Sequence, residues 1–304
     1  MKATRDFFGK KLLELADYDE SIIVINCDLA EATRVLDFKE SFPDRFFDIG
    51  IAEANAISIA SGFSSQGLKP FVTSFGHFLT GKFLEIFQSI GLNNANVTLV
   101  GTHAGLAIGK DGPTQMGLRD IGLMRLLPNV SIFQPFNEYQ TSSIMDQIVE
   151  LPGPKYLRLN RQPQEFFHYE EPFSFGKPDS ILHGSDLLVI AQGAPTVEAH
   201  KAITKLDKKN RIGLISVSSL PLDSTSYFEQ INKYPKILII EDHYSVGGIT
   251  DSILNLIAFN KLCVDIDCIS VNDYGQSGDP KDLYERYSLD EKGISKRISK
   301  ILND

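Results

Sequence analysis

The sequence predicts an α/β protein with two domains, each a mostly parallel sheet flanked by helices. The chain has 304 residues, and a domain usually holds about 100–200. Short apolar runs alternate with segments of helical periodicity along nearly the whole chain, which is the pattern of buried parallel strands in βαβ units. The alternation is interrupted once, near the middle of the chain. These observations together favour two sheets in succession.

The first half contains five expected strands and four expected helices. The strands are the apolar runs at 22–27, 70–74, 97–101, 130–133 and 155–159. The helices are the amphipathic segments at 4–16, 53–66, 82–93 and 137–150. The last of these opens on Asn137, whose side chain can cap the free N–H groups of a helix start.

Residues 160–184 break this pattern with proline, aromatic residues and charges, so they predict a connecting segment. Strands are then expected at 186–191, 212–217, 236–241 and 263–270. Helices are expected near 195–207, 223–233, 247–259 and 290–302. The predicted organisation is a first domain over residues 1–160, a linker over 161–184 and a second domain over 185–304.

Composition excludes several classes of function. The net charge of −9 argues against general nucleic-acid binding, which needs a basic face. No apolar run is long enough for a membrane span, and the start of the chain lacks the apolar core of a signal peptide. We therefore expect a cytoplasmic protein that binds neither nucleic acid nor membrane.

Two segments of the first domain carry candidate chemistry around a cleft. Glu53 lies in the first turn of the predicted helix 53–66, and Phe75 and Phe78 stand three apart after a strand. The acid can simply favour the helix dipole, and the phenylalanines can simply be core. The functional interpretation is a carboxyl group with a raised pKa among apolar neighbours, beside an aromatic wall.

A glycine-rich stretch, THAGLAIGKDGPTQMGLRD, follows the strand predicted at 97–101. Ordered loops after parallel strands are where α/β proteins place ligand sites. Its functional side chains are His103, Asp111, Thr114, Gln115 and Arg119. Asp111 and its glycine neighbour can equally form an ordinary turn.

Taken in order, these motifs resemble the transketolase family. They are D-L at 28–29, G-I-A-E at 50–53, T-S-F-x-x-F at 73–78, T-H-A-G at 102–105, G-x-D-G-P-T at 109–114 and L-R-L-N-R-Q at 157–162. The segment E-D-H-Y-S-V-G-G-I at 241–249 is similar to the signature of the family's C-terminal domain. The resemblance spans nearly the whole chain. It implies a pyrimidine-binding domain followed by the C-terminal domain of a thiamine diphosphate enzyme.

The resemblance implies cofactor-binding roles for four residues. In this family the acid matching Glu53 hydrogen-bonds N1′ of the cofactor's aminopyrimidine and so activates the cofactor, which suits a buried carboxylic acid. The residues matching Phe75 and Phe78 pack on the pyrimidine ring, which needs a flat apolar wall. Asp28 matches an acid near the thiazolium side.

It also implies substrate-binding residues. His103 matches a histidine that faces the sugar or its phosphate, and we expect it to act in catalysis. Asp111 matches an acid that reads a sugar hydroxyl. Arg161 matches a phosphate-binding arginine, which suits its two-pronged guanidinium, although it can also be an exposed linker charge. Gln115 replaces the family's histidine after D-G-P-T; it can hydrogen-bond to substrate but cannot act as a general acid.

A partner chain is implied by what the sequence lacks. We find no G-D-G segment followed by an asparagine, which marks the family's diphosphate and metal domain. Because Mg²⁺ needs an ordered set of oxygen ligands, the metal is expected on a second chain, with no metal ligand here. In this family the active site lies between domains of two protomers. Closed two-fold symmetry then predicts two copies of each chain, including contact between copies of this one.

The predicted function is therefore one subunit of a split transketolase that moves a two-carbon ketol unit from a ketose phosphate to an aldose. One alternative is a 1-deoxyxylulose-5-phosphate synthase-like activity, although T-H-A-G would read D-R-A-G there. A 2-oxoacid dehydrogenase β subunit and a non-catalytic scaffold subunit are the others. The sequence does not name the sugar.

Overall fold

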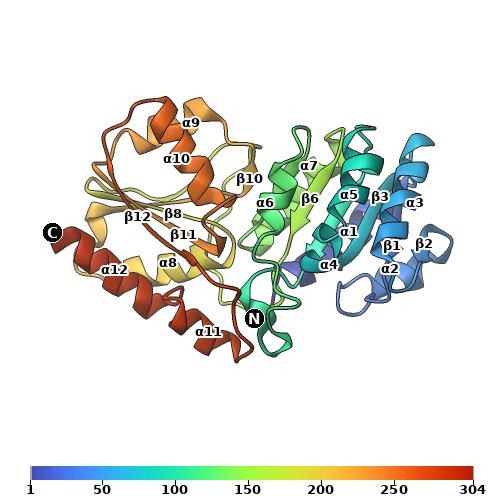
Figure 1. Cartoon of the computed structure of the whole chain (residues 1–304), viewed down its shortest axis with the longest axis horizontal. Helices are drawn as coiled ribbons and strands as arrows, with labels where there is room; N and C mark the ends of the chain where they lie inside the picture. The colour runs from blue at the N-terminus through green and yellow to red at the C-terminus, as the bar shows by residue number, and fades with distance from the viewer. Residues whose placement is uncertain (1, 304) are drawn as a thin grey trace.

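The computed structural model describes residues 2–303. Two lobes lie side by side in Figure 1, one formed by the blue-to-green half of the chain and the other by the yellow-to-red half. Each lobe contains one sheet with helices packed on it, so the predicted two-domain α/β class is confirmed. No helix within 2–303 combines the length and the apolar character needed to cross a membrane.

The first sheet has seven strands in the order β10-β5-β6-β4-β3-β1-β2. Its parallel strands are β1 (Ile22–Asn26), β2 (Phe46–Asp48), β3 (Lys69–Phe75), β4 (Thr98–Thr102), β5 (Ser131–Phe133) and β6 (Lys155–Arg158). The edge strand β10 (Ser219–Leu220) pairs antiparallel with β5. Around the sheet lie α1 (Thr4–Tyr18), α2 (Leu36–Ser41), η1 (Pro43–Arg45), α3 (Glu53–Ser65), α4 (Gly76–Thr80), α5 (Phe83–Glu85), η2 (Ile86–Gly91), η3 (Leu106–Asp111), α6 (Asp120–Arg125) and α7 (Glu138–Glu150).

The second sheet has five strands in the order β12-β11-β8-β9-β7. The strands β8 (Leu187–Ala191), β9 (Ile212–Ser216), β11 (Lys236–Tyr244) and β12 (Asp265–Val271) are parallel, and β7 (Asp179–Leu182) pairs antiparallel with β9. The helices are α8 (Ala194–Thr204), η4 (Lys209–Arg211), α9 (Ser224–Ile231), α10 (Ile249–Phe259), α11 (Pro280–Arg286) and α12 (Glu291–Asn303). Thus β7 lies inside the segment 161–184 that the sequence predicted as a linker.

Local predictions were most accurate where the pattern was long. Asn137 precedes α7 and its Oδ1 accepts the N–H of Gln140 at 2.8 Å, which confirms the predicted cap. The helix expected at 82–93 is wrong as a single α-helix, because α5 gives way to the π-helical turn η2. The strands β2 and β10 were not predicted, since three and two residues are too few to show a pattern.

A buried ion pair stands where the two lobes meet. Arg158, at the end of β6, donates from Nε to Asp120 Oδ2 at 2.8 Å, and both side chains are almost fully buried. Tyr156 donates its hydroxyl to the same carboxylate oxygen at 2.7 Å. Arg158 also donates to the carbonyl oxygen of Asp242 in the second domain at 3.0 Å. The pair therefore ties β6 and α6 to the neighbouring domain.

Replacing one member of this pair measures how much the pair contributes to the stability of the fold. Asp120→Asn keeps the shape of the side chain but removes the charge that compensates Arg158. Leaving a buried charge uncompensated costs about 3–5 kcal/mol, so we expect that loss in the free energy of unfolding. Urea unfolding followed by circular dichroism measures it.

The matched control is Asp251→Asn. Asp251 pairs with Arg125 at 3.3 Å, but its side chain is 46% exposed, so we expect a change below about 1 kcal/mol. Equal effects of the two substitutions would show that the buried pair does not stabilise the junction.

Candidate active site at the carboxyl edge of the first sheet

Candidate residues from four strands meet at one edge of the first sheet. Since β1, β3, β4 and β6 are parallel, their carboxyl ends lie at the same edge. At those ends are Asp28 after β1, Phe75 ending β3, His103 after β4 and Arg161 beyond β6. The strand order also reverses between β1 and β3, and such switch points are where open α/β sheets bind ligands.

Glu53 is the first residue of α3 and is buried, with 6% of its surface exposed. Ser74 donates its hydroxyl to Glu53 Oε1 at 2.9 Å. The other carboxylate oxygen has no hydrogen-bond partner among residues 2–303. The Cys27 thiol lies nearby, and burial together with the charges of Glu53 and Asp48 raises its pKa to about 12. One carboxyl oxygen is thus left for a ligand, beside a neutral thiol.

Two aromatic rings follow Ser74, the residue that binds this acid. The rings of Phe75 and Phe78 stack with centroids 5.5 Å apart and planes 16° apart, and both side chains are half-buried. His103 stacks on Phe75 with a centroid separation of 3.9 Å. The two phenylalanine rings therefore lie nearly parallel, and His103 covers one face of Phe75.

Asp48 organises the loops in front of β1 and was not singled out from the sequence. Its Oδ1 accepts the backbone N–H groups of Asp28 and Gly50, each at 3.1 Å. Asn26 donates to Oδ2 at 3.0 Å. Asp28 is exposed and has a φ of 59°, a left-handed conformation that is uncommon outside glycine but that aspartate tolerates better than most residues.

His103 is held as a neutral imidazole. Arg5 approaches its Nε2 at 2.9 Å, and because a guanidinium only donates, Nε2 accepts and the proton resides on Nδ1. Thr102 Oγ1 lies 2.9 Å from Nδ1 and receives it. Burial lowers the pKa of His103 to about 3, aided by the charges of Arg5, Arg161 and Arg34. His103 therefore carries no charge at neutral pH.

Sequence reasoning missed two of the three arginines around His103. Arg5 comes from α1 and Arg34 from the loop before α2. Burial and the charge of Arg34 lower the pKa of Arg5 to about 10, with a smaller contribution from Arg161. Arg5 Nε is buried without a partner, and the nearby acid Asp6 is taken by Arg34 at 2.7 Å. The cluster therefore keeps a net positive charge suited to an anion.

The glycine-rich stretch closes this positive site on one side. Asp111 Oδ2 lies 3.3 Å from Arg161 NH1, and both side chains remain partly exposed. Arg161 also donates to the carbonyl oxygen of Ile108 at 3.3 Å. Gln115 is half-buried, and its side chain makes no hydrogen bond to the described part of the chain. The stretch, expected from the sequence to be an ordered loop, contains the short 3₁₀ segment η3.

The structure thus brings the candidates into two adjoining groups. The first is Glu53 with Phe75 and Phe78, and His103 joins it to the second. The second group is made up of Arg5, Arg34, Arg161 and Asp111. Asp28 lies at the same edge, and its side chain bonds to neither group within the described chain. Within 2–303, no group of three or more His, Cys, Asp or Glu side chains is placed to hold a metal ion.

The buried His103 predicts a pH dependence of stability. Its pKa of about 3 in the folded chain lies below the ordinary 6.5, so the unfolded chain binds the proton more tightly. Stability from this group is present above about pH 6.5 and is lost toward pH 3. Between pH 7 and pH 5 the loss is about 2 kcal/mol. His103→Gln should therefore destabilise the chain less at pH 5 than at pH 7, by urea unfolding.

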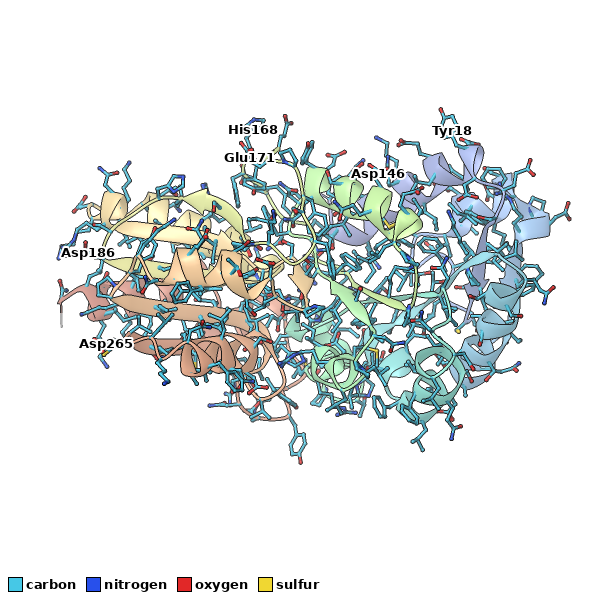
Figure 2. The ribbon with its side chains drawn as sticks, turned by 90° about the horizontal axis from the view of Figure 1, so that it is seen from above. Tyr18, Asp146, His168, Glu171, Asp186 and Asp265 are labelled. Atoms are coloured by element: carbon cyan, nitrogen blue, oxygen red, sulfur yellow. The ribbon has the colours of Figure 1, made fainter. Side chains whose placement is uncertain are left out.

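Comparison with wild type at each pH is necessary because burial raises the pKa of Asp179 and Glu241 to about 7, and these acids act in the opposite direction. The control is His168→Gln, since His168 projects outward from the connecting segment (Figure 2) and is 84% exposed. Parallel pH profiles for wild type and His103→Gln would contradict the neutral, buried state.

Comparison with known proteins identifies two family domains in the chain. Residues 1–164 match the model of the transketolase pyrimidine binding domain, and residues 176–294 match that of the transketolase C-terminal domain. The solved structure of a "split gene transketolase, inactive beta4 tetramer" is 31% identical, with a TM-score of 0.90 over 100% of this chain and 99% of that one.

Three curated relatives are similar over nearly all of this chain. A putative transketolase C-terminal section of Methanocaldococcus jannaschii is 34% identical over 98% of this chain and 95% of its own length. One subunit of the apulose-4-phosphate transketolase of Phocaeicola vulgatus is 30% identical over 97% and 96%. The 1-deoxy-D-xylulose-5-phosphate synthase of Aquifex aeolicus is 30% identical over 96%, but this chain spans only 47% of that enzyme. The chain belongs to the transketolase family and resembles the C-terminal half of a split-gene enzyme.

Proposed function

We propose that this chain is one subunit of a thiamine diphosphate-dependent transketolase that transfers a two-carbon ketol unit from a ketose phosphate to an aldose. The observation that carries the proposal is the buried Glu53 and its aromatic wall, at the same sheet edge as a cluster of three arginines. The first group fits an aminopyrimidine, and the second fits a sugar phosphate.

The residues present fit the pyrimidine end of the cofactor. Glu53 keeps one carboxyl oxygen free while Ser74 holds the other, so a ring nitrogen can share a proton with it. The stacked pair of Phe75 and Phe78 offers an aromatic surface against which a flat ring can pack, with His103 already against Phe75. Thiamine diphosphate supplies the carbanion chemistry needed to break a bond beside a ketone. Asp28, at the end of β1, is the acid we assign to the thiazolium side.

The arginine cluster is proposed to bind the substrate's phosphate. Arg5, Arg34 and Arg161 together lower the pKa of one buried histidine, so their charges act on the same point. An anion there satisfies the unpartnered Arg5 Nε and draws Arg5 away from His103 Nε2. His103 Nε2 is then free to accept a hydrogen bond from a sugar hydroxyl, and Asp111 can accept another. Phosphate binding and availability of the histidine are thus coupled.

Gln115 completes the proposed substrate site. Its side chain has both a donor and an acceptor, so it can either donate a hydrogen bond to a sugar hydroxyl or accept one from it. It titrates at no relevant pH, which leaves His103 as the group that moves a proton near the sugar. Substrate choice is therefore expected to depend on hydrogen bonding at position 115.

A second chain is proposed to complete the site. Of two relatives of matching length, one is named as a C-terminal section and the other as a transketolase subunit, and a solved structural relative is named as split-gene. We infer that the partner supplies the ligands for the diphosphate and Mg²⁺. Two copies of each chain then form the closed assembly, with the site between unlike chains.

A 1-deoxyxylulose-5-phosphate synthase-like activity is the second candidate. The 30% identity to the Aquifex aeolicus enzyme favours it. His103, in T-H-A-G, and its contact with Arg5 favour ketol transfer instead, because they place a proton acceptor beside the phosphate site.

Co-expression with the chain that carries the diphosphate domain tests the proposal. We expect thiamine diphosphate- and Mg²⁺-dependent ketol transfer from xylulose 5-phosphate to ribose 5-phosphate in the mixture alone. Formation of 1-deoxyxylulose 5-phosphate would establish the second candidate. Absence of cofactor binding by the complex would favour a scaffold subunit.

Glu53→Gln should lower ketol transfer by about 100-fold or more, because an amide cannot share the proton with the pyrimidine ring. The matched control is Glu40→Gln on the exposed face of α2, which should leave the rate unchanged. Wild-type activity in Glu53→Gln would remove this acid from the mechanism.

Arg161→Ala should raise KM for a phosphorylated ketose about 10- to 100-fold, because this factor corresponds to the free energy of a hydrogen bond to a charged group. The same substitution should change KM for the dephosphorylated ketose far less. Arg211→Ala, which removes an arginine from the surface of the second domain, serves as the control. Equal effects on both ketoses would place the phosphate elsewhere.

A further inference from the structure

The second domain reaches the substrate loop through one buried carboxylate. Asp242 lies near the end of β11 and is 5% exposed. Its Oδ1 accepts the backbone N–H of Leu106, the first residue of η3, at 2.9 Å. Its Oδ2 accepts the hydroxyl of Tyr284, from α11, at 2.9 Å. Asp242 therefore links the start of the loop in the first domain to a helix of the second.

The loop is fitted closely to this carboxylate. Gly105 has a φ of 78°, and a Cβ atom there would lie 2.1 Å from Asp242 Oδ2. Only glycine allows the backbone to approach so near. The Gly105 N–H also donates to the carbonyl oxygen of Gly117 at 3.1 Å, so the two ends of the loop are joined to each other.

Arg158 holds the far end of the same loop. Its NH2 donates to the carbonyl oxygen of Gly117 at 2.7 Å and to that of Asp242 at 3.0 Å. Between the two ends, Ser277 of the second domain donates to the carbonyl oxygen of Lys110 at 2.6 Å. Residues 105–117 are thus bound at both ends and near the middle, and the second domain contributes Asp242 at the start and Ser277 near the middle.

The place of Asp242 in its own sheet is also informative. The strand order of the second sheet reverses between β8 and β11, so the crevice at their carboxyl ends is where this class of fold binds ligands. Here Asp242 lies at that end of the sheet, and the backbone of Gly105 and Leu106 from the first domain packs against it. The carboxyl end of β11 therefore contacts the loop of the neighbouring domain.

We propose that Asp242 is a positioning residue for the substrate site, which fixes the loop carrying Asp111 and Gln115 relative to Arg161. The inference rests on the proposed function for its effect on substrate, but the fixing of the loop is testable without substrate. Its consequence follows from geometry, since a small displacement of groups that orient a substrate lowers efficiency strongly.

Three substitutions in the full complex test the role. Asp242→Ala removes the acceptor for Leu106 N–H. Asp242→Asn keeps the size and one acceptor oxygen, which can still receive that N–H. Asp265→Ala is the matched control, since Asp265 points into solvent on the same domain (Figure 2).

For Asp242→Ala we expect KM for the ketose phosphate to rise about 10-fold, with kcat changed much less. Asp242→Asn should restore KM to within about 3-fold of wild type, and the control should match wild type. Hydrogen exchange at the Leu106 amide should accelerate in the alanine variant alone. If that variant does not fold, Asp242→Glu replaces it, because one added methylene must push the loop away.

Unchanged KM and unchanged Leu106 exchange in Asp242→Ala, or in Asp242→Glu where that replaces it, would overturn the proposal. So would an equal loss in the asparagine and alanine variants, since it would show that the charge, not the hydrogen bond to the loop, matters. A wild-type complex without ketol transfer would contradict the proposed function instead. The exchange measurement would still decide whether Asp242 holds the loop.

Discussion

The structure depends on keeping one guanidinium fully satisfied where the two domains meet. Arg158 is almost completely buried, and an isolated charge there would be prohibitively costly. Asp120 compensates it, and the carbonyl oxygens of Gly117 and Asp242 take up its other donors. These partners come from α6, the glycine-rich loop and β11. Arg158 therefore links the first sheet, the loop and the second domain, and moving any of these partners leaves a buried charge or a buried donor unsatisfied.

This arrangement also fixes the positions of the side chains in the candidate site. Acidic, aromatic and basic side chains lie at the carboxyl ends of the parallel strands, at one edge of the sheet. The hydrogen bonds around Arg158 hold the glycine-rich loop in place beside them. Three residues at this edge, Asp28, Arg34 and His103, hold left-handed backbone angles without being glycine. Such angles persist only where the surrounding structure over-determines them, and they gather at functional sites. These three of the six positive-φ non-glycine residues within 2–303 therefore lie in the same region as the positive charge.

The sequence predicted those features that depend on neighbours along the chain. Long apolar runs revealed β1, β3 and β8, and Asn137 revealed the start of α7, because periodicity and capping act over a few residues. Glu53 and Arg161 were found through motifs. Arg5 and Arg34 were not, since Arg5 meets His103 across 98 positions and resembles any charge on an amphipathic helix. Asp242 was quoted only as part of a signature, because its loop contact spans 136 positions.

The strand β10 comes from the second half of the chain but belongs to the first sheet, and this affects the order in which the sheet forms during synthesis. Ser219 and Leu220 follow the second domain's β9, yet they complete the first sheet beside Ile132 and Phe133. During synthesis the first domain emerges with β5 as an open edge, and such an edge readily pairs with other chains. It closes only after about a further half-domain of polypeptide has left the ribosome. The first sheet is therefore complete only after part of the second domain has been synthesised.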